Sequence, residues 1–345
     1  MVTADKVTGG QKYTGIMASS EIYDPSTGKW KTAASMAKPR EYHTATLLNS
    51  GKVLVAGGEG YTGYTTSCEI YDPSTNQWNT TGSMATPRAF HTAILLNSGK
   101  VLVTGGTTFS INSATTSCEL YDPSTGKWNP TGNMTIAREY HTATMLKSGK
   151  VLVTGSAPSS EIYDPTTGQW TPPTKMAAVR YDHTATLLKS GKVLVTGGGY
   201  ESADFLASSE IYDPSTDQWD TIASMAIARQ FHSAILIGSG KALVTGGVGY
   251  SNFLASCEMY DPTTGKWNNI TSMTAERSSH TTTMLNSGKV LATAGYGYTG
   301  YLDTSEIYDP STGEWNPTGS LETTRSTHTA TRLNSGKVFV TGGEQ

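Results

Sequence analysis

The chain has 345 residues, a charged fraction of 15% and a formal net charge of −3, which argues against a general nucleic-acid binder that neutralises phosphates. No apolar run approaches the roughly 20 residues of a membrane-spanning helix, so no membrane insertion is expected. The opening segment Met1–Lys6 lacks the apolar stretch of a secretory signal. The compartment of this soluble chain stays undetermined, with a slight preference for an extracellular one.

A repeat runs through the whole sequence. It is marked by seven tryptophans, which lie 42 to 50 residues apart. They are Trp30, Trp78, Trp128, Trp170, Trp219, Trp267 and Trp315. A period near 50 indicates one supersecondary unit copied along the chain. The 37 glycines suit many short strands joined by tight turns.

Each repeat predicts four antiparallel strands, which we name a to d. In the first complete repeat they are strand a at His43–Leu48, strand b at Val53–Ala56, strand c at Ser67–Tyr71 and strand d from Gln77. Strand b is apolar throughout, as expected of a strand that is covered on both faces. Four such strands per unit predict a propeller blade.

The two ends of the chain predict one further blade between them. Residues 13–36 supply strands c and d, and residues 328–343 supply strands a and b, so that the ends pair side by side. Such closure removes the open sheet edges that invite aggregation. We therefore expect a monomer with one domain over residues 1–345, in which residues 1–12 form a redundant extension.

The repeat closely resembles the kelch-repeat family, part of a superfamily that also holds the galactose-oxidase propellers. The resemblance rests on Tyr-Asp-Pro, on the Trp seven residues after that Tyr, and on a glycine pair such as Gly57-Gly58; it covers the whole chain. It implies an all-β, seven-bladed propeller of four-stranded antiparallel blades. Two repeats depart from the glycine pair, with Gly155-Ser156 and Ala294-Gly295, and there we expect a slightly altered backbone.

Candidate binding residues gather in the loops of one face. Strand direction places the b–c and d–a loops on one side, the top face, and the a–b and c–d turns on the other, the bottom face. Every length change between repeats falls in a b–c loop, and loops that vary on a constant scaffold are the usual place for recognition. Well-studied kelch domains also bind ligands on this side. Any single ring there can instead pack against a neighbouring blade.

Fourteen side chains are the candidate ligand-binding residues. In the b–c loops they are Tyr61, Tyr64, Phe109, Tyr200, Phe205, Tyr250, Phe253, Tyr298 and Tyr301. Just before strand a they are Tyr42, Phe90, Tyr140, Asp182 and Phe231.

Polar residues that recur in every blade are interpreted as structural. The Arg and His of the Arg-x-x-His motif are expected to pair with the strand-c Glu or with backbone carbonyls rather than to bind a metal. No metal, other cofactor or catalytic residue is predicted, and Cys68, Cys118 and Cys257 are expected to be free and buried. Lysines gather in the bottom turns and acidic residues in the top loops. This distribution of charge is typical of a surface that keeps the protein soluble. If the arginines are not exposed, it instead indicates a top-face site for neutral or cationic ligands.

The preferred functional hypothesis is a non-catalytic binding module that recognises a protein or peptide through the top face. A carbohydrate-binding, lectin-like propeller is the alternative, because sugars stack on exposed aromatic rings. The close similarity of the blades also allows an engineered or recently amplified scaffold without a specific ligand. Copper radical oxidases share this architecture, but the sequence shows no asymmetric catalytic constellation, so an enzyme is not expected.

Overall fold

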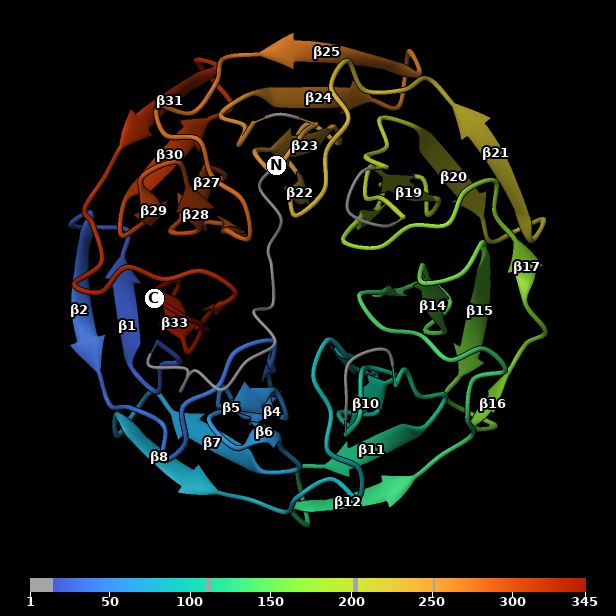
Figure 1. Cartoon of the computed structure of the whole chain (residues 1–345), viewed down its shortest axis with the longest axis vertical. Helices are drawn as coiled ribbons and strands as arrows, with labels where there is room; N and C mark the ends of the chain where they lie inside the picture. Colours follow the sequence, from blue (N-terminus) through green and yellow to red (C-terminus); the bar gives the residue numbers. More distant parts are fainter. Residues whose placement is uncertain (1–14, 110–112, 201–203, 251) are drawn as a thin grey trace.

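The computed structural model describes residues 15–109, 113–200, 204–250 and 252–345. Over these ranges the chain forms strands and turns without a helix, and the strands build a ring of seven four-stranded antiparallel blades (Figure 1). The predicted all-β, seven-bladed propeller is therefore confirmed. The extension predicted for residues 1–12 lies outside the described residues. Nowhere in the described ranges does a helix have the length and hydrophobicity needed to cross a membrane.

Each blade runs from strand a near the central axis to strand d at the rim (Figure 1). Blade 1 consists of β32 (Thr329–Arg332), β33 (Val338–Thr341), β1 (Ser20–Asp24) and β2 (Lys29–Ala33). Blade 2 consists of β3 (Thr44–Leu47), β4 (Val53–Ala56), β7 (Cys68–Asp72) and β8 (Gln77–Thr80). Blade 3 consists of β9 (Thr92–Leu95), β10 (Val101–Thr104), β11 (Cys118–Asp122) and β12 (Lys127–Pro130).

The remaining blades follow the same order. Blade 4 consists of β13 (Thr142–Met145), β14 (Val151–Thr154), β15 (Ser159–Asp164) and β16 (Gln169–Trp170), with β17 (Thr174–Lys175) beside β15. Blade 5 consists of β18 (Thr184–Leu187), β19 (Val193–Thr196), β20 (Ser209–Asp213) and β21 (Gln218–Ile222). Blade 6 consists of β22 (Ser233–Leu236), β23 (Ala242–Thr245), β24 (Cys257–Asp261) and β25 (Lys266–Ile270). Blade 7 consists of β26 (Thr281–Met284), β27 (Val290–Thr293), β30 (Ser305–Asp309) and β31 (Glu314–Pro317).

Short elements modify two b–c loops and one outer strand. Two-residue hairpins stand in the loops of blades 2 and 7. They are β5 (Glu59–Gly60) with β6 (Gly63–Tyr64), and β28 (Tyr296–Gly297) with β29 (Gly300–Tyr301). In blade 4, Pro172 and Pro173 fall between β16 and β17. Because proline has no N–H to give to a sheet ladder, the outer strand is broken there into two pieces.

The fixed Tyr-to-Trp spacing follows from the c–d hairpin. The register of β7 and β8 sets Tyr71 opposite Trp78, and their ring centroids lie 5.3 Å apart. The same pair recurs in every blade at 5.1–5.3 Å. Nε1 of Trp78 donates to the carbonyl of Ala34 in blade 1 at 2.8 Å. This tryptophan thus packs within its own blade and bonds the outer edge of the preceding one.

The hydrophobic core lies between blades rather than inside one. The strand-b residues are buried, with Val53 and Val55 fully inaccessible to solvent. Leu54 of blade 2 belongs to one cluster with Val101 and Tyr121 of blade 3. Each blade therefore buries its faces only against its two neighbours, as in other repeat architectures.

The two ends of the chain close the ring as predicted. β1 pairs with β33 in antiparallel fashion, with Ser20 opposite Thr341 and Ile22 opposite Phe339. Phe339 also stacks on Tyr71 of blade 2, with centroids 4.2 Å apart and ring planes at 6°. The C-terminal segment therefore supplies strand b of blade 1.

The two departures from the glycine pair behave differently. An intact pair has φ of 63° at Gly57 and 97° at Gly58. Ala294 and Gly295 keep this pattern, with 56° and 108°, so the altered backbone expected there is absent. Gly155 and Ser156 reverse it, with 98° and 64°, which agrees with the expected change. An alanine at φ near 56° is strained because its Cβ crowds the following carbonyl.

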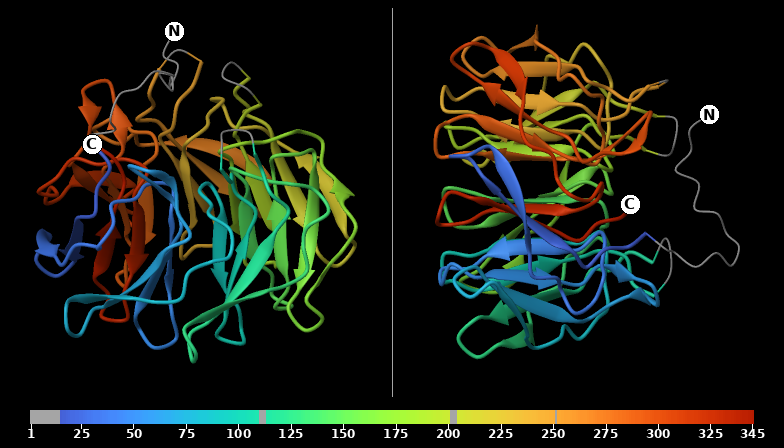
Figure 2. Two further views of the ribbon diagram at one scale, coloured as in Figure 1. Left: turned by 60° about the horizontal axis from the view of Figure 1, so that its bottom comes forward. Right: turned by 90° about the vertical axis from the view of Figure 1, so that its left-hand side faces the viewer.

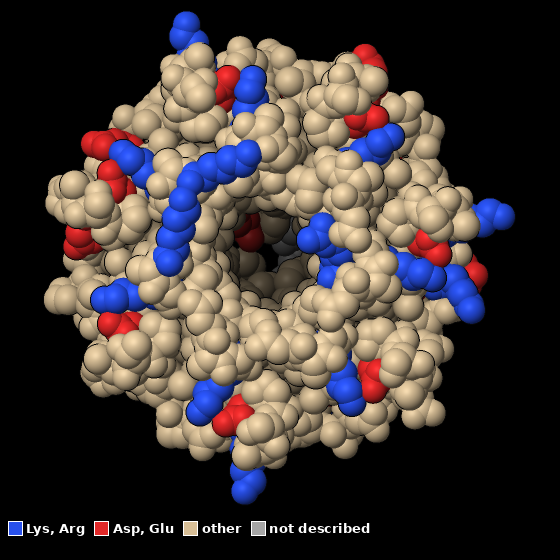
Figure 3. Space-filling view, turned by 180° about the vertical axis from the view of Figure 1, so that it is seen from behind, with Lys and Arg blue, Asp and Glu red and all other residues tan. Residues whose placement is uncertain are grey.

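Loops gather on two opposite faces of the ring, as the edge-on view shows (Figure 2). The bottom face repeats one ion pair in each blade between the a–b turn lysine and the c–d turn aspartate, at 2.9–3.4 Å (Figure 3). The space-filling view of that face also shows a hollow at the ring centre. The top face carries the variable b–c loops.

Candidate functional site

The innermost part of the top face is a ring of seven residues, one from each blade, two positions before strand a. We call it the axial ring. Its members are Tyr42, Phe90, Tyr140, Asp182, Phe231, Ser279 and Thr327. All seven have φ between 49° and 55°, a left-handed conformation that is uncommon outside glycine, asparagine and aspartate. Five of the predicted site residues therefore belong to one continuous structure.

Backbone hydrogen bonds link the axial ring from blade to blade. The N–H of Phe90 donates to the carbonyl of Tyr42 at 3.2 Å, and the N–H of Tyr140 donates to Phe90 at 3.2 Å. The pattern continues through six consecutive steps to Thr327, at 3.0–3.3 Å. The left-handed backbone turns each N–H toward the preceding blade, which explains why aromatic, hydroxyl and acidic residues all tolerate it here.

The side chains of the axial ring differ in polarity from one side of the ring to the other. Tyr42 and Phe90 have ring centroids 4.1 Å apart, and Phe90 and Tyr140 have centroids 4.2 Å apart. Burial raises the pKa of Tyr42 and of Tyr140 above the usual range of a phenol. One side of the ring is therefore an apolar stack, whereas the other carries Asp182, Phe231 and two hydroxyl residues.

Asp182 is the acidic member of the axial ring. Burial, followed by the nearby charge of Glu139, raises the pKa of Asp182 to about 8. Within the described part of the chain, no hydrogen bond or cation offsets these two effects. This carboxyl group is therefore mostly protonated near neutral pH.

A second acidic group lies where blades 1 and 2 meet. Glu41 is only 3% exposed and forms a β-bridge with Glu59. Burial, followed by the charges of Glu344 and Glu59, raises the pKa of Glu41 to about 8. Thr327 Oγ1 lies 3.5 Å from Glu41, and Ser326 Oγ donates to Glu344 at 3.2 Å. The junction of blades 1 and 2 thus holds several carboxyl groups together.

Five of the predicted aromatic residues are exposed, one in each long b–c loop. Their exposed fractions are 54% for Tyr61, 82% for Phe109, 47% for Tyr200, 67% for Tyr250 and 59% for Tyr298. The short loop of blade 4, residues 155–158, contains no aromatic residue. The top face therefore carries a broken circle of solvent-exposed rings.

Three of these exposed tyrosines bond to the loop of the preceding blade through their hydroxyl groups. Tyr61 donates to the carbonyl of Ile16 at 2.8 Å, and Tyr250 donates to that of Phe205 at 3.0 Å. Tyr298 donates to Oδ1 of Asn252 at 2.5 Å. Because one end of each ring is fixed, its exposed face is held in place at a low entropic cost for a ligand.

The other predicted loop aromatics pack against neighbours. Phe205 is buried and meets Tyr250 edge-on at 5.3 Å. Phe253 meets Tyr298 at 5.3 Å, and Tyr301 meets Tyr296 at 5.0 Å. Tyr64 lies opposite Glu59 in the β5–β6 hairpin and is half-buried. These residues support the exposed rings rather than project beside them.

A hollow of about 620 Å³ opens between blades 5 and 6. Its lining is mostly apolar. It consists of Phe205, Ala207, Ala226, Ile227, Ala228, Gly249, Tyr250, Asn252 and Leu254. Ile227 is 36% exposed, which is unusual for a large aliphatic side chain in a d–a loop. Phe205 and Tyr250 are sequence-predicted residues, whereas the aliphatic part of the lining was not predicted.

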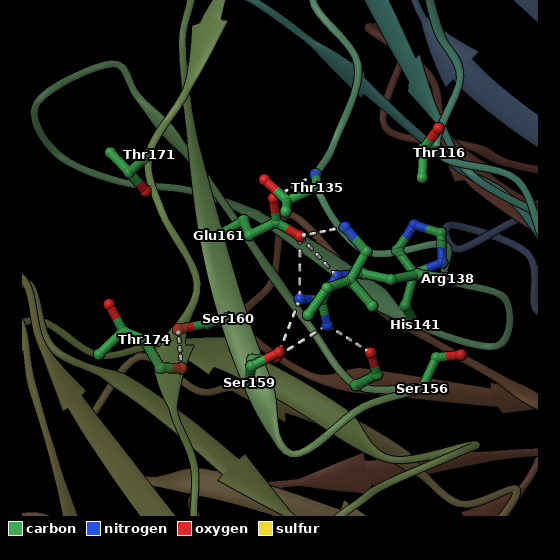
Figure 4. A network of polar contacts seen from close by, with 12 residues as sticks. Thr116, Thr135, Arg138, His141, Ser156, Ser159, Ser160, Glu161, Thr171 and Thr174 are labelled. Atoms are coloured by element: carbon green, nitrogen blue, oxygen red, sulfur yellow. Dashed lines mark hydrogen bonds and ion pairs between the residues drawn. The ribbon is translucent and has the colours of Figure 1, made fainter.

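Each motif arginine pairs with the strand-c glutamate of its own blade, as predicted. Nη2 of Arg138 lies 3.1 Å from the Glu161 carboxylate, and its Nη1 donates to the carbonyls of Gly155 and Ser159 at 2.7 and 2.8 Å (Figure 4). The same Arg–Glu pair occurs in all seven blades at 2.8–3.1 Å, with the arginine side chain fully buried. The arginines are therefore not available to a ligand.

The motif histidines are also structural, but with a partner that the sequence did not indicate. Nε2 of His43 lies 3.0 Å from the hydroxyl of Thr329 in blade 1. Each of the other histidines meets a threonine of its preceding blade at 2.8–3.0 Å. Burial, followed by the charge of Arg40, lowers the pKa of His43 to about 3, so this imidazole is neutral.

The cysteines match their prediction as well. All three are free and buried, and burial raises the pKa of Cys68 to about 11 and that of Cys257 to about 12. Across the described ranges, no three His, Cys, Asp or Glu side chains converge as ligands of a metal ion.

Some residues of this face escaped the sequence reasoning. Ile227 lies two residues before the motif arginine, in a segment that begins with Met in six repeats and with Leu321 in the seventh. At this position the repeats carry Lys38, Thr86, Ile136, Ala178, Ile227, Ala275 and Thr323. The alternation of aliphatic, hydroxyl and lysine side chains at this position is the signal that could have identified it. Glu344 lies far from Glu41 in sequence, so no local pattern connects the two.

Comparison with known proteins agrees with this geometry. The family described as the KLHDC2/KLHL20/DRC7 Kelch-repeats domain matches residues 7–156 and 157–343. No curated protein matches the sequence.

Two solved structures share the fold. One, titled "Structure of YjhT", is 14% identical with a TM-score of 0.65, and the match covers 82% of this chain and 98% of that one. The other is a fungal alcohol oxidase of the AA5 family in complex with copper, which is 18% identical with a TM-score of 0.72. That match covers 90% of this chain and 76% of the oxidase chain. At these identities the likeness establishes the architecture alone. With the repeat matched over nearly its whole length, the chain belongs to the kelch-repeat family.

Proposed function

We propose that this chain is a binding module that recognises a protein or peptide through its top face. One observation carries the proposal: the five long b–c loops each hold an aromatic ring in solvent on the same face. Exposed tyrosine and phenylalanine rings provide large contact areas with few rotatable bonds, which is typical of interaction surfaces. Membership of the kelch family, whose propellers usually mediate protein interactions, supports the same conclusion.

The construction of the two faces supports this choice of side. On the bottom face each blade repeats the same lysine–aspartate pair, so that surface offers little to distinguish one partner from another. On the top face the loops differ in length and in side chains. The fixed hydroxyl groups of Tyr61, Tyr250 and Tyr298 hold their rings before any partner arrives.

A peptide selection tests the proposal. Random heptapeptides displayed on phage are selected on the immobilised full chain, and the enriched peptides are titrated by fluorescence anisotropy. We expect Tyr250→Ala or Tyr298→Ala to weaken binding roughly tenfold or more, because interface aromatics are often hot spots. Tyr250→Phe and Tyr298→Phe are the matched controls and should retain most of the affinity, since they keep the ring.

Two outcomes would contradict the proposal. In one, the enriched peptides bind all five ring-to-alanine variants as tightly as the parent chain. In the other, no peptide is enriched, while a glycan array shows selective binding that the same alanine changes abolish. That second result would establish the carbohydrate-binding alternative.

A further inference from the structure

The hollow between blades 5 and 6 has room for an apolar side chain of a bound segment. Its volume of about 620 Å³ lies within the range of pockets that accept small ligands. Ile227 and Leu254 approach it from two different loops, and Phe205 and Tyr250 add aromatic surface. The hydroxyl of Tyr250 is already bonded to the carbonyl of Phe205, so that tyrosine holds one wall in place.

The charged groups around the hollow are acidic. Asp204 is exposed and directly precedes Phe205 of the lining. Ala228 of the lining is three residues from Phe231, whose N–H donates to the carbonyl of Asp182 at 3.2 Å. Three residues span at most about 11 Å of chain, so the hollow and the acidic part of the axial ring are neighbours.

Cations of the protein do not offset this charge. Arg180, Arg229 and Arg277, the arginines of the surrounding loops, are fully buried in their glutamate pairs. In the described top-face loops, the exposed cations are Lys38 and Lys175, which belong to the segments before blades 2 and 5 and do not line the hollow.

We propose that this hollow docks a peptide segment that places an apolar side chain between blades 5 and 6 and a nearby lysine or arginine against the exposed carboxylate of Asp204. The proposal rests on the proposed function and names the chemistry of the partner. An apolar side chain alone would leave the acidic rim unpaired, and a cation alone would leave the hollow empty. A segment with both fills the site and supplies the missing counter-charge.

The experiment uses the heptapeptide selection on the full chain, now with hollow and charge variants. We expect enriched peptides to combine an aliphatic or aromatic residue with a lysine or arginine within three positions. Their affinity should fall at least tenfold with Ile227→Asp and at least threefold with Asp204→Lys. Raising NaCl from 50 to 500 mM should also weaken them, because the rim charges are exposed.

Matched controls come from the repeat itself. Ile136→Asp changes the equivalent position of the loop before blade 4, which does not line the hollow, and Asp220→Lys reverses an exposed charge on the rim strand β21. Both should leave binding unchanged. Ile227→Ser is a milder change at the same position, and thermal unfolding is measured for every variant. A variant that binds weakly but unfolds at the parent temperature has lost docking rather than folding.

The results distinguish the two proposals. Two outcomes would overturn the docking inference and leave the proposed binding module intact. In one, the enriched peptides depend on Tyr298 but are acidic or uncharged. In the other, they bind the Ile227→Asp and Ile227→Ser variants as tightly as the parent chain. Peptides indifferent to every exposed ring would overturn the proposed function itself. The inference would be established if the enriched peptides carry both a cation and an apolar residue. Their affinity must also fall with Ile227→Ser and Asp204→Lys but stay unchanged with the two controls.

Discussion

The bottom and top faces of the ring hold their carboxyl groups in opposite ways. On the bottom, Ser26 and Lys337 donate to Asp24, and these bonds lower the pKa of that carboxyl to about 2. On the top, burial raises the pKa of Glu41 and of Asp182 to about 8, and neighbouring acids add to the effect. The bottom carboxylate is bonded to a lysine and a hydroxyl group, whereas no cation is among the groups that shift the pKa of these two top acids.

Backbone conformation divides the faces in the same way. Left-handed positions in the bottom turns are occupied by glycine, by Asn76 or by Asp217, the residues that adopt this conformation most readily. On the top face the same conformation is imposed on Phe90, Thr327 and Ala294. Strained backbone concentrates at functional positions. The difference indicates that the top face gives up local stability for a particular arrangement of side chains.

The largest expected effect tests the framework that both faces share. Arg138→Ala leaves Glu161 buried without its cation and removes two bonds to backbone carbonyls. Losing one partner of such a pair should lower the free energy of unfolding by about 3–5 kcal/mol. Lys150→Ala, which removes the half-exposed bottom pair of the same blade, should leave the denaturation midpoint nearly unchanged. Equal effects of the two changes would contradict the division between framework and surface.

A pH titration of stability sharpens the contrast between the faces. Because the pKa of Glu41 is raised from 4.5 to about 8, the folded chain binds more protons than the unfolded chain between these values. The free energy of unfolding should therefore fall as pH rises through this window, by at most about 1.4 kcal/mol per pH unit for one proton. Glu41→Gln should make this slope less steep in urea denaturation at a series of pH values, and the raised pKa of Asp182 accounts for a slope that remains. An unchanged slope in that variant would show that Glu41 is not responsible.

The smallest expected effect concerns backbone strain. Thr327 has a φ of 51°, so Thr327→Gly should relieve strain in the backbone. The free energy of unfolding should rise by about 0.5–1 kcal/mol after the entropy cost of glycine is subtracted. Gly288 of a bottom turn has φ of 82° and open space where a Cβ would be added, so Gly288→Ala should destabilise the fold through conformation alone, by about 1 kcal/mol. Thermal unfolding of both variants measures the two effects. Shifts of the same sign would remove the argument that strain distinguishes the faces.

The fold was predictable because its signals are local and repeated. Tyr71 and Trp78 face each other across one hairpin, so their spacing is fixed in every blade. The Arg138–Glu161 pair lies within one repeat, so its recurrence was visible along the chain. Closure followed from counting strands, since each end of the sequence holds only half a blade.

The site was less predictable because it forms between repeats. The axial ring exists only when seven blades meet at one axis, so nothing in a single repeat reveals its backbone bonds. The His43–Thr329 contact and the grouping of Glu41 with Glu344 join residues at opposite ends of the sequence. The hollow depends on how the loops of blades 5 and 6 pack. Sequence placed the aromatic residues on the correct face, but it did not separate exposed Tyr298 from packed Phe253.

The closing blade has a consequence for the order of events during synthesis. Ser20 and Thr341 are 321 residues apart in the chain, yet their side-chain oxygens lie 2.8 Å apart. Blades 2 to 7 can each form from a single continuous stretch as it leaves the ribosome, because their contacts are short-range. β1 must wait, with an unpaired edge, until β33 has been made after the strands of the other six blades. The period before that pairing is when the nascent chain is most open to strand exchange with a second copy.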